Sequence, residues 1–161
     1  MEPFFFEEPD GNSGGALRTV TVNGQRYERL LSDHVLPVLQ SKPEEVKTAL
    51  IFQQDGAPPH IFRPVKDLLR NFFGSRVISR HFPDEWPPRS PGLNPLDFWL
   101  WGYLGSRVFQ RAPKSIQELR KAIRDEISVI TPEQLSDAVD SFHGRVLAVI
   151  ENNGGHFEQM R

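Results

Sequence analysis

Two aspartates are the residues of this sequence best placed to do chemistry. Asp55 lies in FQQDGAPPH and Asp97 lies in WPPRSPGLNPLDFWLWGYL. Carboxylate oxygens are hard ligands, and such ligands suit Mg²⁺ or Mn²⁺. A metal site that uses both acids is therefore the first hypothesis, and it depends on the elements that hold each one.

Asp55 follows the apolar run 48–53, which has the length and the β-branched or aromatic character of a short buried strand. Gly56, Pro58 and Pro59 then end this strand. An acid at the end of a central strand projects from the C-terminal edge of the sheet, where open α/β folds build their sites. The alternative is that Asp-Gly is only a turn dipeptide.

Asp97 follows Asn94 and Pro95 in an order that predicts the start of a helix. Asn94 is the expected N-cap, Pro95 the first helical residue, and Asp97 an acid of the first turn. The helix dipole there favours the ionised carboxylate that a metal ligand requires. The alternative is that Asp97 only stabilises its own helix, which explains one acid and not the pair.

The two aspartate segments resemble the catalytic domain of mariner-type transposases, the DDE/DDD group of ribonuclease-H-like nucleotidyltransferases. PFFFE, VTVNGQRYERLL and the terminal GGH are similar to the same family in the same order, so the resemblance covers nearly the whole chain. It implies that Asp55 matches the second catalytic carboxylate and Asp97 the third, which is Asp here rather than Glu. The wide interval between them resembles a divergent branch.

The resemblance also implies a reaction and its partners. Carboxylates of such enzymes hold two Mg²⁺ or Mn²⁺ ions, which activate the nucleophile and stabilise the leaving oxygen at a DNA phosphodiester. The DNA partner is a transposon end or target DNA. This chemistry serves transposition and DNA integration, and it implies a nuclear protein.

One part of the family pattern is missing. The first catalytic Asp of the family lies on a strand before PFFFE, and the sequence begins at Met1 without that strand. We therefore expect this chain alone to bind metal weakly and not to cleave or join DNA. A missing upstream segment and a homodimer are the candidate protein partners. The alternative function is a non-catalytic remnant, domesticated or decayed, that binds DNA or protein.

Four further residues are candidates for the side of the site or for DNA contacts: His60, Trp86, Arg89 and Asn94. A neutral His60 can orient water or touch phosphate, and its alternative role is that of a histidine bonded at a loop end. An aromatic ring beside a cation can stack on bases and hold phosphate, which applies to Trp86 and Arg89. The alternative for Trp86 is packing beneath its loop.

Composition and charge fit one intracellular globular domain. The chain has 161 residues, of which 38% are hydrophobic and 25% charged, and it has no cysteine for disulfides or thiolate metal sites. Neither a signal peptide nor a membrane span is predicted. The net charge is −2, yet residues 61–124 hold 12 basic and 5 acidic side chains. This basic block either faces DNA or is an ordinary solvated surface.

The fold class predicted for residues 1–161 is α/β. The resemblance implies a ribonuclease-H-like mixed sheet with flanking helices, incomplete because its first, central strand is missing. One partial transposase catalytic domain is expected, with no separate DNA-reading domain. The expected elements are strands 3–7 and 18–22 in a hairpin, a helix after residues 23–24, strand 48–53, helix 64–73, strand 77–78, a proline-rich loop 82–95, a deeply buried helix from Asn94, and two capped helices from Ser115 and Thr131.

Overall fold

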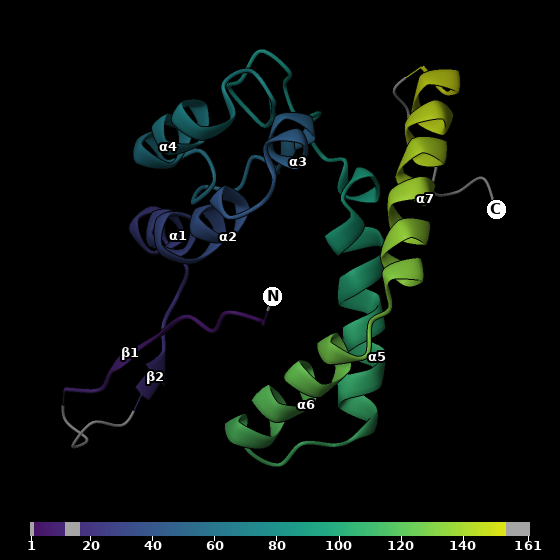
Figure 1. Cartoon of the computed structure of the whole chain (residues 1–161). Helices are drawn as coiled ribbons and strands as arrows, with labels where there is room; N and C mark the ends of the chain where they lie inside the picture. The colour runs from purple at the N-terminus through teal and green to yellow at the C-terminus, as the bar shows by residue number, and fades with distance from the viewer. Residues whose placement is uncertain (1, 12–16, 154–161) are drawn as a thin grey trace. The chain divides into compact units, whose positions relative to one another are not determined.

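The computed structural model describes residues 2–11 and 17–153 of the chain (Figure 1). The chain divides into two compact units, one of Phe4–Pro88 and one of Met1–Pro3 with Arg89–Arg161. We call them the Asp55 unit and the Asp97 unit, after the aspartate that each contains. No helix in the described part of the chain is long and apolar enough to cross a membrane.

The Asp55 unit begins with a β-hairpin. β1 (Glu7–Pro9) pairs antiparallel with β2 (Leu17–Thr19). A hydrogen bond from the Val20 N–H to the Phe6 carbonyl, at 3.0 Å, extends the pairing by one step. The predicted hairpin is confirmed, but regular strand pairing covers Glu7–Pro9 and Leu17–Thr19 instead of the ranges 3–7 and 18–22.

A long helical segment follows the hairpin. It consists of α1 (Gly24–Leu30), a π-helical turn (Leu31–Val35) and α2 (Leu36–Gln40). Asn23 caps it, since its side-chain oxygen accepts a hydrogen bond from the Arg26 N–H at 2.9 Å. Pro37 has no N–H to donate and its ring crowds the preceding turn. The wider π turn just before Pro37 accommodates that ring, so the helix continues past the proline.

The segment before Asp55 differs from its prediction. α3 (Glu44–Ala49) is a helix that includes the first residues of the expected strand 48–53, and β3 consists of Phe52–Gln53 alone. Glu44 and Glu45 stand in the first turn, where acids favour a helix. The Thr48 hydroxyl donates to the Glu44 carbonyl at 3.0 Å. These local interactions outweigh the strand preference of Thr48.

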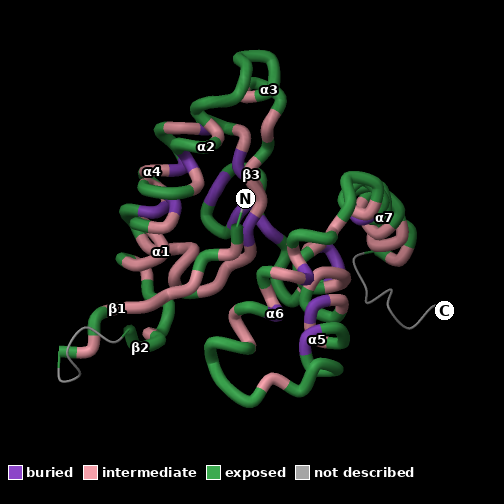
Figure 2. The backbone as a smooth tube through the Cα atoms, turned by 60° about the horizontal axis from the view of Figure 1, so that its bottom comes forward, coloured by how far each residue is buried: buried purple, intermediate pink, exposed green. Residues whose placement is uncertain are grey.

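The core of the Asp55 unit forms around α4 (Arg63–Phe73), which packs against α1. β3 pairs parallel with β4 (Val77–Ile78), so that Phe52 lies opposite Val77. Within the described residues the strands make two separate two-stranded sheets. Helix 64–73 and strand 77–78 are confirmed. Figure 2 shows the buried positions in purple, and those of the main cluster are Leu31, Leu36, Val65, Leu69, Phe73, Val77 and Phe82.

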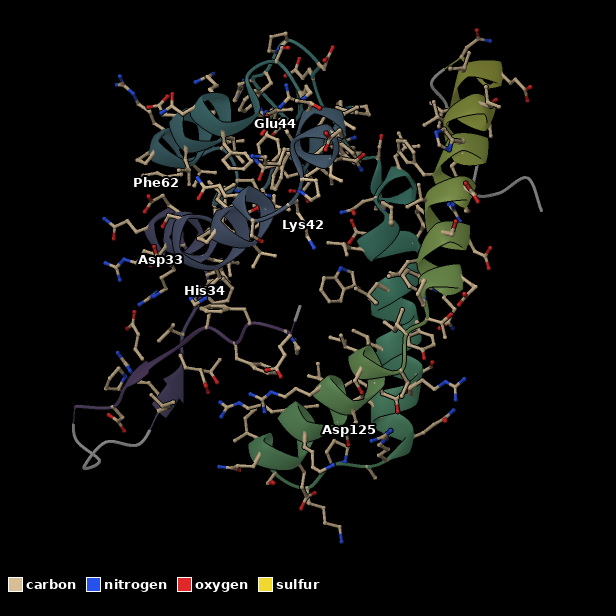
Figure 3. The ribbon with its side chains drawn as sticks, viewed as in Figure 1. Asp33, His34, Lys42, Glu44, Phe62 and Asp125 are labelled. Atoms are coloured by element: carbon tan, nitrogen blue, oxygen red, sulfur yellow. The ribbon has the colours of Figure 1, made fainter. Side chains whose placement is uncertain are left out.

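The Asp97 unit is helical. Its elements are a 3₁₀ turn (Pro91–Leu93), a π-helical turn (Leu96–Leu100), α5 (Trp101–Gln110), α6 (Ile116–Ser128) and α7 (Pro132–Glu151). Thr131 and Gln134 form the predicted capping box of α7. Ser115 caps α6, but the Glu118 side chain accepts from the Lys114 N–H instead of from Ser115. Asp125 of α6, labelled in Figure 3, pairs with Lys121 at 2.7 Å. The terminal GGH lies outside the described residues.

The helix after Asp97 is less buried than predicted. Leu104 and Val108 are buried, but Trp101 is 55% exposed and Phe109 is 71% exposed. The prediction of a deeply buried helix is therefore wrong. An apolar surface all around a helix is buried only if neighbours cover every side, and α5 packs chiefly against α6.

Candidate functional site

Asp55 follows β3 by two residues and its side chain is fixed by two hydrogen bonds. Its Oδ1 accepts from the Ala57 N–H at 2.9 Å and lies 2.5 Å from His60 Nδ1. An ionised carboxylate only accepts, so Nδ1 must carry the proton and the Nε2 of a neutral ring is unprotonated. The Asp55 side chain is 41% exposed. Oδ1 is thus committed to the protein, and Oδ2 takes part in none of these bonds.

Gln54, the residue before Asp55, supports the turn from beneath. It is buried, and its backbone N–H continues the β3–β4 ladder by donating to the Ile78 carbonyl at 3.1 Å. Its side-chain Nε2 donates to the His60 carbonyl at 3.0 Å and to the fully buried Ser79 Oγ at 3.1 Å. The turn that carries Asp55 is therefore attached to both strands of the sheet.

Tyr27 of α1 completes this arrangement. Its hydroxyl donates to Gln54 Oε1 at 3.0 Å, and its ring lies 4.6 Å from the His60 ring between centroids. Burial, with a smaller contribution from the charge of Asp55, raises the pKa of Tyr27 to about 12. Tyr27 is therefore a neutral hydroxyl, able to donate, throughout the physiological range of pH.

Asp97 lies in the first turn of its helix, as predicted. Its Oδ2 accepts from Asn94 Nδ2 at 2.8 Å, and Asn94 Oδ1 accepts from the Leu96 N–H at 3.1 Å. The Asn94 carbonyl also accepts from the Asp97 N–H at 2.9 Å. Asn94 therefore closes the helix start and holds the carboxylate. The turn at residues 96–100 is π-helical, a form that is frequent at functional sites.

Arg145 of α7 holds the segment that leads to Asp97. Its Nη1 donates to the Gly92 carbonyl at 3.2 Å, and its guanidinium lies 4.0 Å from the centroid of the Phe98 ring. A cation over an aromatic face is attracted by the ring quadrupole. The two contacts fix the chain on both sides of the Asn94–Asp97 turn.

The remaining predicted residues differ in exposure. Trp86 is only 7% exposed, which favours packing over a contact with DNA. Arg89 is exposed and has φ 56°, an uncommon value for a residue with a Cβ. The DNA contact of Arg89 stays a prediction.

The structure fixes each aspartate within its own unit. Asp55 is brought together with His60, and Asp97 with Asn94. Because the aspartates belong to different units, their convergence on shared metal ions stays a prediction. Among the described residues, no group of three or more His, Asp or Glu side chains is arranged to hold a metal.

The sequence did not single out four supporting residues: Tyr27, Gln54, Ser79 and Arg145. In the sequence, Tyr27 is one apolar position of a helical stripe, and nothing distinguishes Arg145 from the other charges of the last helix. Gln54 is the neighbour of Asp55, and a polar residue so close to the end of a buried strand was the one feature of the sequence that could have indicated a supporting role. The contacts of Tyr27 and Ser79 join residues 27 and 25 positions from Gln54, which no local pattern reveals.

No protein-family model matches the chain. It is similar to two curated transposases of nematode transposable elements. It is 31% identical to the Tc3 transposase of Caenorhabditis elegans over 64% of this chain and 30% of that protein. It is 27% identical to the Tcb2 transposase of Caenorhabditis briggsae over 80% of this chain and 43% of that protein. The chain thus spans less than half the length of either relative.

Solved structures have the same fold. The chain superposes on the Mos1 transposase catalytic domain solved with raltegravir and Mn with a TM-score of 0.72, at 23% identity, over 89% of this chain and 71% of that chain. It superposes on the Mos1 mariner paired end complex with Mn with a TM-score of 0.73, at 25% identity, over 89% of this chain and 40% of that chain. The predicted ribonuclease-H-like fold class is thereby confirmed.

Proposed function

Because this chain is homologous to the transposases of the Tc1/mariner family and has the fold of a mariner transposase catalytic domain, we propose that it supplies two metal-binding aspartates to a DNA-cleaving and strand-transferring site. Asp55 and Asp97 are these aspartates. The substrate is DNA, and the reaction is displacement at a phosphodiester. The observation that carries the proposal is the fixed Asp55 carboxylate at the end of β3, with Oδ1 bound to the protein and Oδ2 left for a ligand.

The donor atoms fit a hard divalent cation. Asp55 and Asp97 offer carboxylate oxygens, which Mg²⁺ and Mn²⁺ prefer over softer ligands. Such an ion, when bound, polarises the phosphate and makes the attacking oxygen easier to deprotonate. A complete site requires a further ligand, and a strand that precedes PFFFE is its proposed source.

The residues of this chain have separate tasks in the proposed site. Asp55 and Asp97 hold the cation, while Asn94 keeps Asp97 turned toward the helix start. With its Nδ1–H donated to Asp55, the neutral His60 ring has Nε2 left to accept a hydrogen bond from water. Arg89, which is exposed, is placed on the DNA backbone because guanidinium groups fit phosphate oxygens in pairs.

Titration of the chain with Mn²⁺, followed by electron paramagnetic resonance, tests the assignment of the two aspartates. Asp55→Asn and Asp97→Asn should each weaken Mn²⁺ binding by at least about tenfold, which is about 1.4 kcal/mol of lost ligand interaction. Asp137→Asn is the matched control, because Asp137 is an exposed acid of α7. Equal Mn²⁺ affinity in all three variants would contradict the proposal.

A further inference from the structure

The hydrogen bonds beneath Asp55 have only one possible polarity. The His60 carbonyl can only accept, so the Gln54 amide must present its nitrogen there. The amide oxygen then faces the Tyr27 hydroxyl, which must donate. Each member thus fixes the orientation of the next.

Because of these hydrogen bonds, the group formed by Tyr27, Gln54, Ser79 and His60 is sensitive to the loss of any one hydrogen-bonding side chain. Gln54 and Ser79 are buried, at 6% and 0% exposure, so a lost partner is not replaced freely by water. His60 is held at three points: its carbonyl by Gln54, its Nδ1 by Asp55, and its ring face by Tyr27. Few ring positions satisfy all three contacts together.

We propose that Tyr27, Gln54 and Ser79 are positioning residues that hold His60 so that its Nδ1–H clamps Asp55 Oδ1 and leaves Oδ2 as the metal-facing oxygen. The geometry carries this role, because Tyr27 comes from α1 while Gln54 directly follows β3 and Ser79 directly follows β4. None of the three touches the reacting atoms. The inference rests on the proposed function, since it assigns a purpose to the orientation of a metal-binding carboxylate.

Exchange of the His60 Nδ1 proton with water, measured by ¹H–¹⁵N NMR on the metal-free chain, tests the clamp. The native chain should show the Nδ1–H tautomer and a protected proton. Tyr27→Phe and Ser79→Ala should each speed its exchange by about tenfold, the effect expected of one buried hydrogen bond. Tyr103→Phe, the same deletion of a hydroxyl in α5, is the control and should leave exchange unchanged.

Amide exchange in α4 separates positioning from loss of fold. Positioning predicts that the amides of Val65 and Leu69 keep their protection in Tyr27→Phe and Ser79→Ala while the His60 proton loses it. His60 exchange that stays within twofold of the native rate in both variants would overturn the inference. So would a parallel loss of protection in α4, which would show general destabilisation.

Addition of Mn²⁺ to the same samples distinguishes this inference from the function on which it rests. Paramagnetic broadening of the His60 signals in the native chain, reduced in Tyr27→Phe, supports both. If Mn²⁺ broadens nothing near His60 but the exchange effects hold, the metal site is wrong and the clamp stands. If Mn²⁺ broadens His60 equally in every variant, the clamp does not control the metal-facing oxygen and the inference fails.

Discussion

At the scale of single residues, the two aspartates differ in how local their support is: Asn94, three residues away, holds Asp97, whereas the bonds beneath Asp55 involve the distant Tyr27 and Ser79. Asp97 was placed correctly because the order Asn94, Pro95, Leu96, Asp97 is a local signal for a helix start. The position of Asp55 at a strand end was predicted from the turn-forming residues that follow it. The contacts of Gln54 with Tyr27 and Ser79 depend on how three elements pack, and such contacts leave no periodic trace in a sequence.

Tyr27 should make the stability of the chain depend on alkaline pH. Its pKa is about 12 in the folded chain and about 10 when unfolded, so the unfolded state loses this proton first as pH rises. The stabilisation that comes from the neutral Tyr27 hydroxyl is complete below about pH 10 and is lost as pH approaches about 12, a change of about 3 kcal/mol. Urea unfolding at several alkaline pH values checks this. Tyr27→Phe should remove that part of the decline, and an identical decline in both proteins would refute it.

At the scale of elements, strong periodic segments were predicted well and short ones were not. α4 was found because its apolar residues follow helical spacing and Gly74 ends it. The strand expected at 48–53 shrank to Phe52–Gln53, because the helical signals of α3 reach into the same run. α5 is an apolar helix whose neighbours do not cover every side, so the burial of a helix cannot be predicted from its composition alone.

Gly24 should tolerate no side chain, because α1 and α4 meet there. A Cβ at Gly24 would lie 2.4 Å from Cγ of Phe62, which is labelled in Figure 3. Gly24→Ala should therefore destabilise the chain by about 1–3 kcal/mol, the usual cost of overpacking. In α5, Gly102→Ala meets nothing within 4 Å and should stabilise its helix by up to about 1 kcal/mol. Thermal unfolding compares the two, and equal shifts in Tm would contradict the proposed contact.

At the scale of the whole molecule, charge distribution says more than net charge. The chain is slightly acidic overall, with a net charge of −2, yet residues 61–124 are strongly basic. The family resemblance predicted the ribonuclease-H-like fold, the order of the expected strands and helices predicted the α/β class, and composition predicted only one globular domain. None of these predicted that the strands of the described residues form two separate two-stranded sheets, because strand pairing depends on how distant segments pack.

DNA binding by the chain should depend on salt through the basic block. Arg63→Gln removes one exposed cation at the start of α4 without placing an acid beside Asp67, the ion-pair partner of Arg63. The slope of log affinity against log salt should become shallower by about one, the effect of one lost phosphate contact. Lys42→Gln, which removes one exposed cation outside the block, is the control. Fluorescence anisotropy at several salt concentrations measures both, and equal slopes would argue against a DNA-facing α4.

The contacts of Arg145 with Gly92 and Phe98 have a consequence for coding sequences that are interrupted after Asp97. A nonsense or frameshift change between codons 98 and 145 leaves both aspartates encoded but deletes the residue that anchors the Asp97 turn. Survival of the two aspartate codons is therefore an insufficient criterion that the Asp97 turn is held in place. An open reading frame that extends through α7 is the better one.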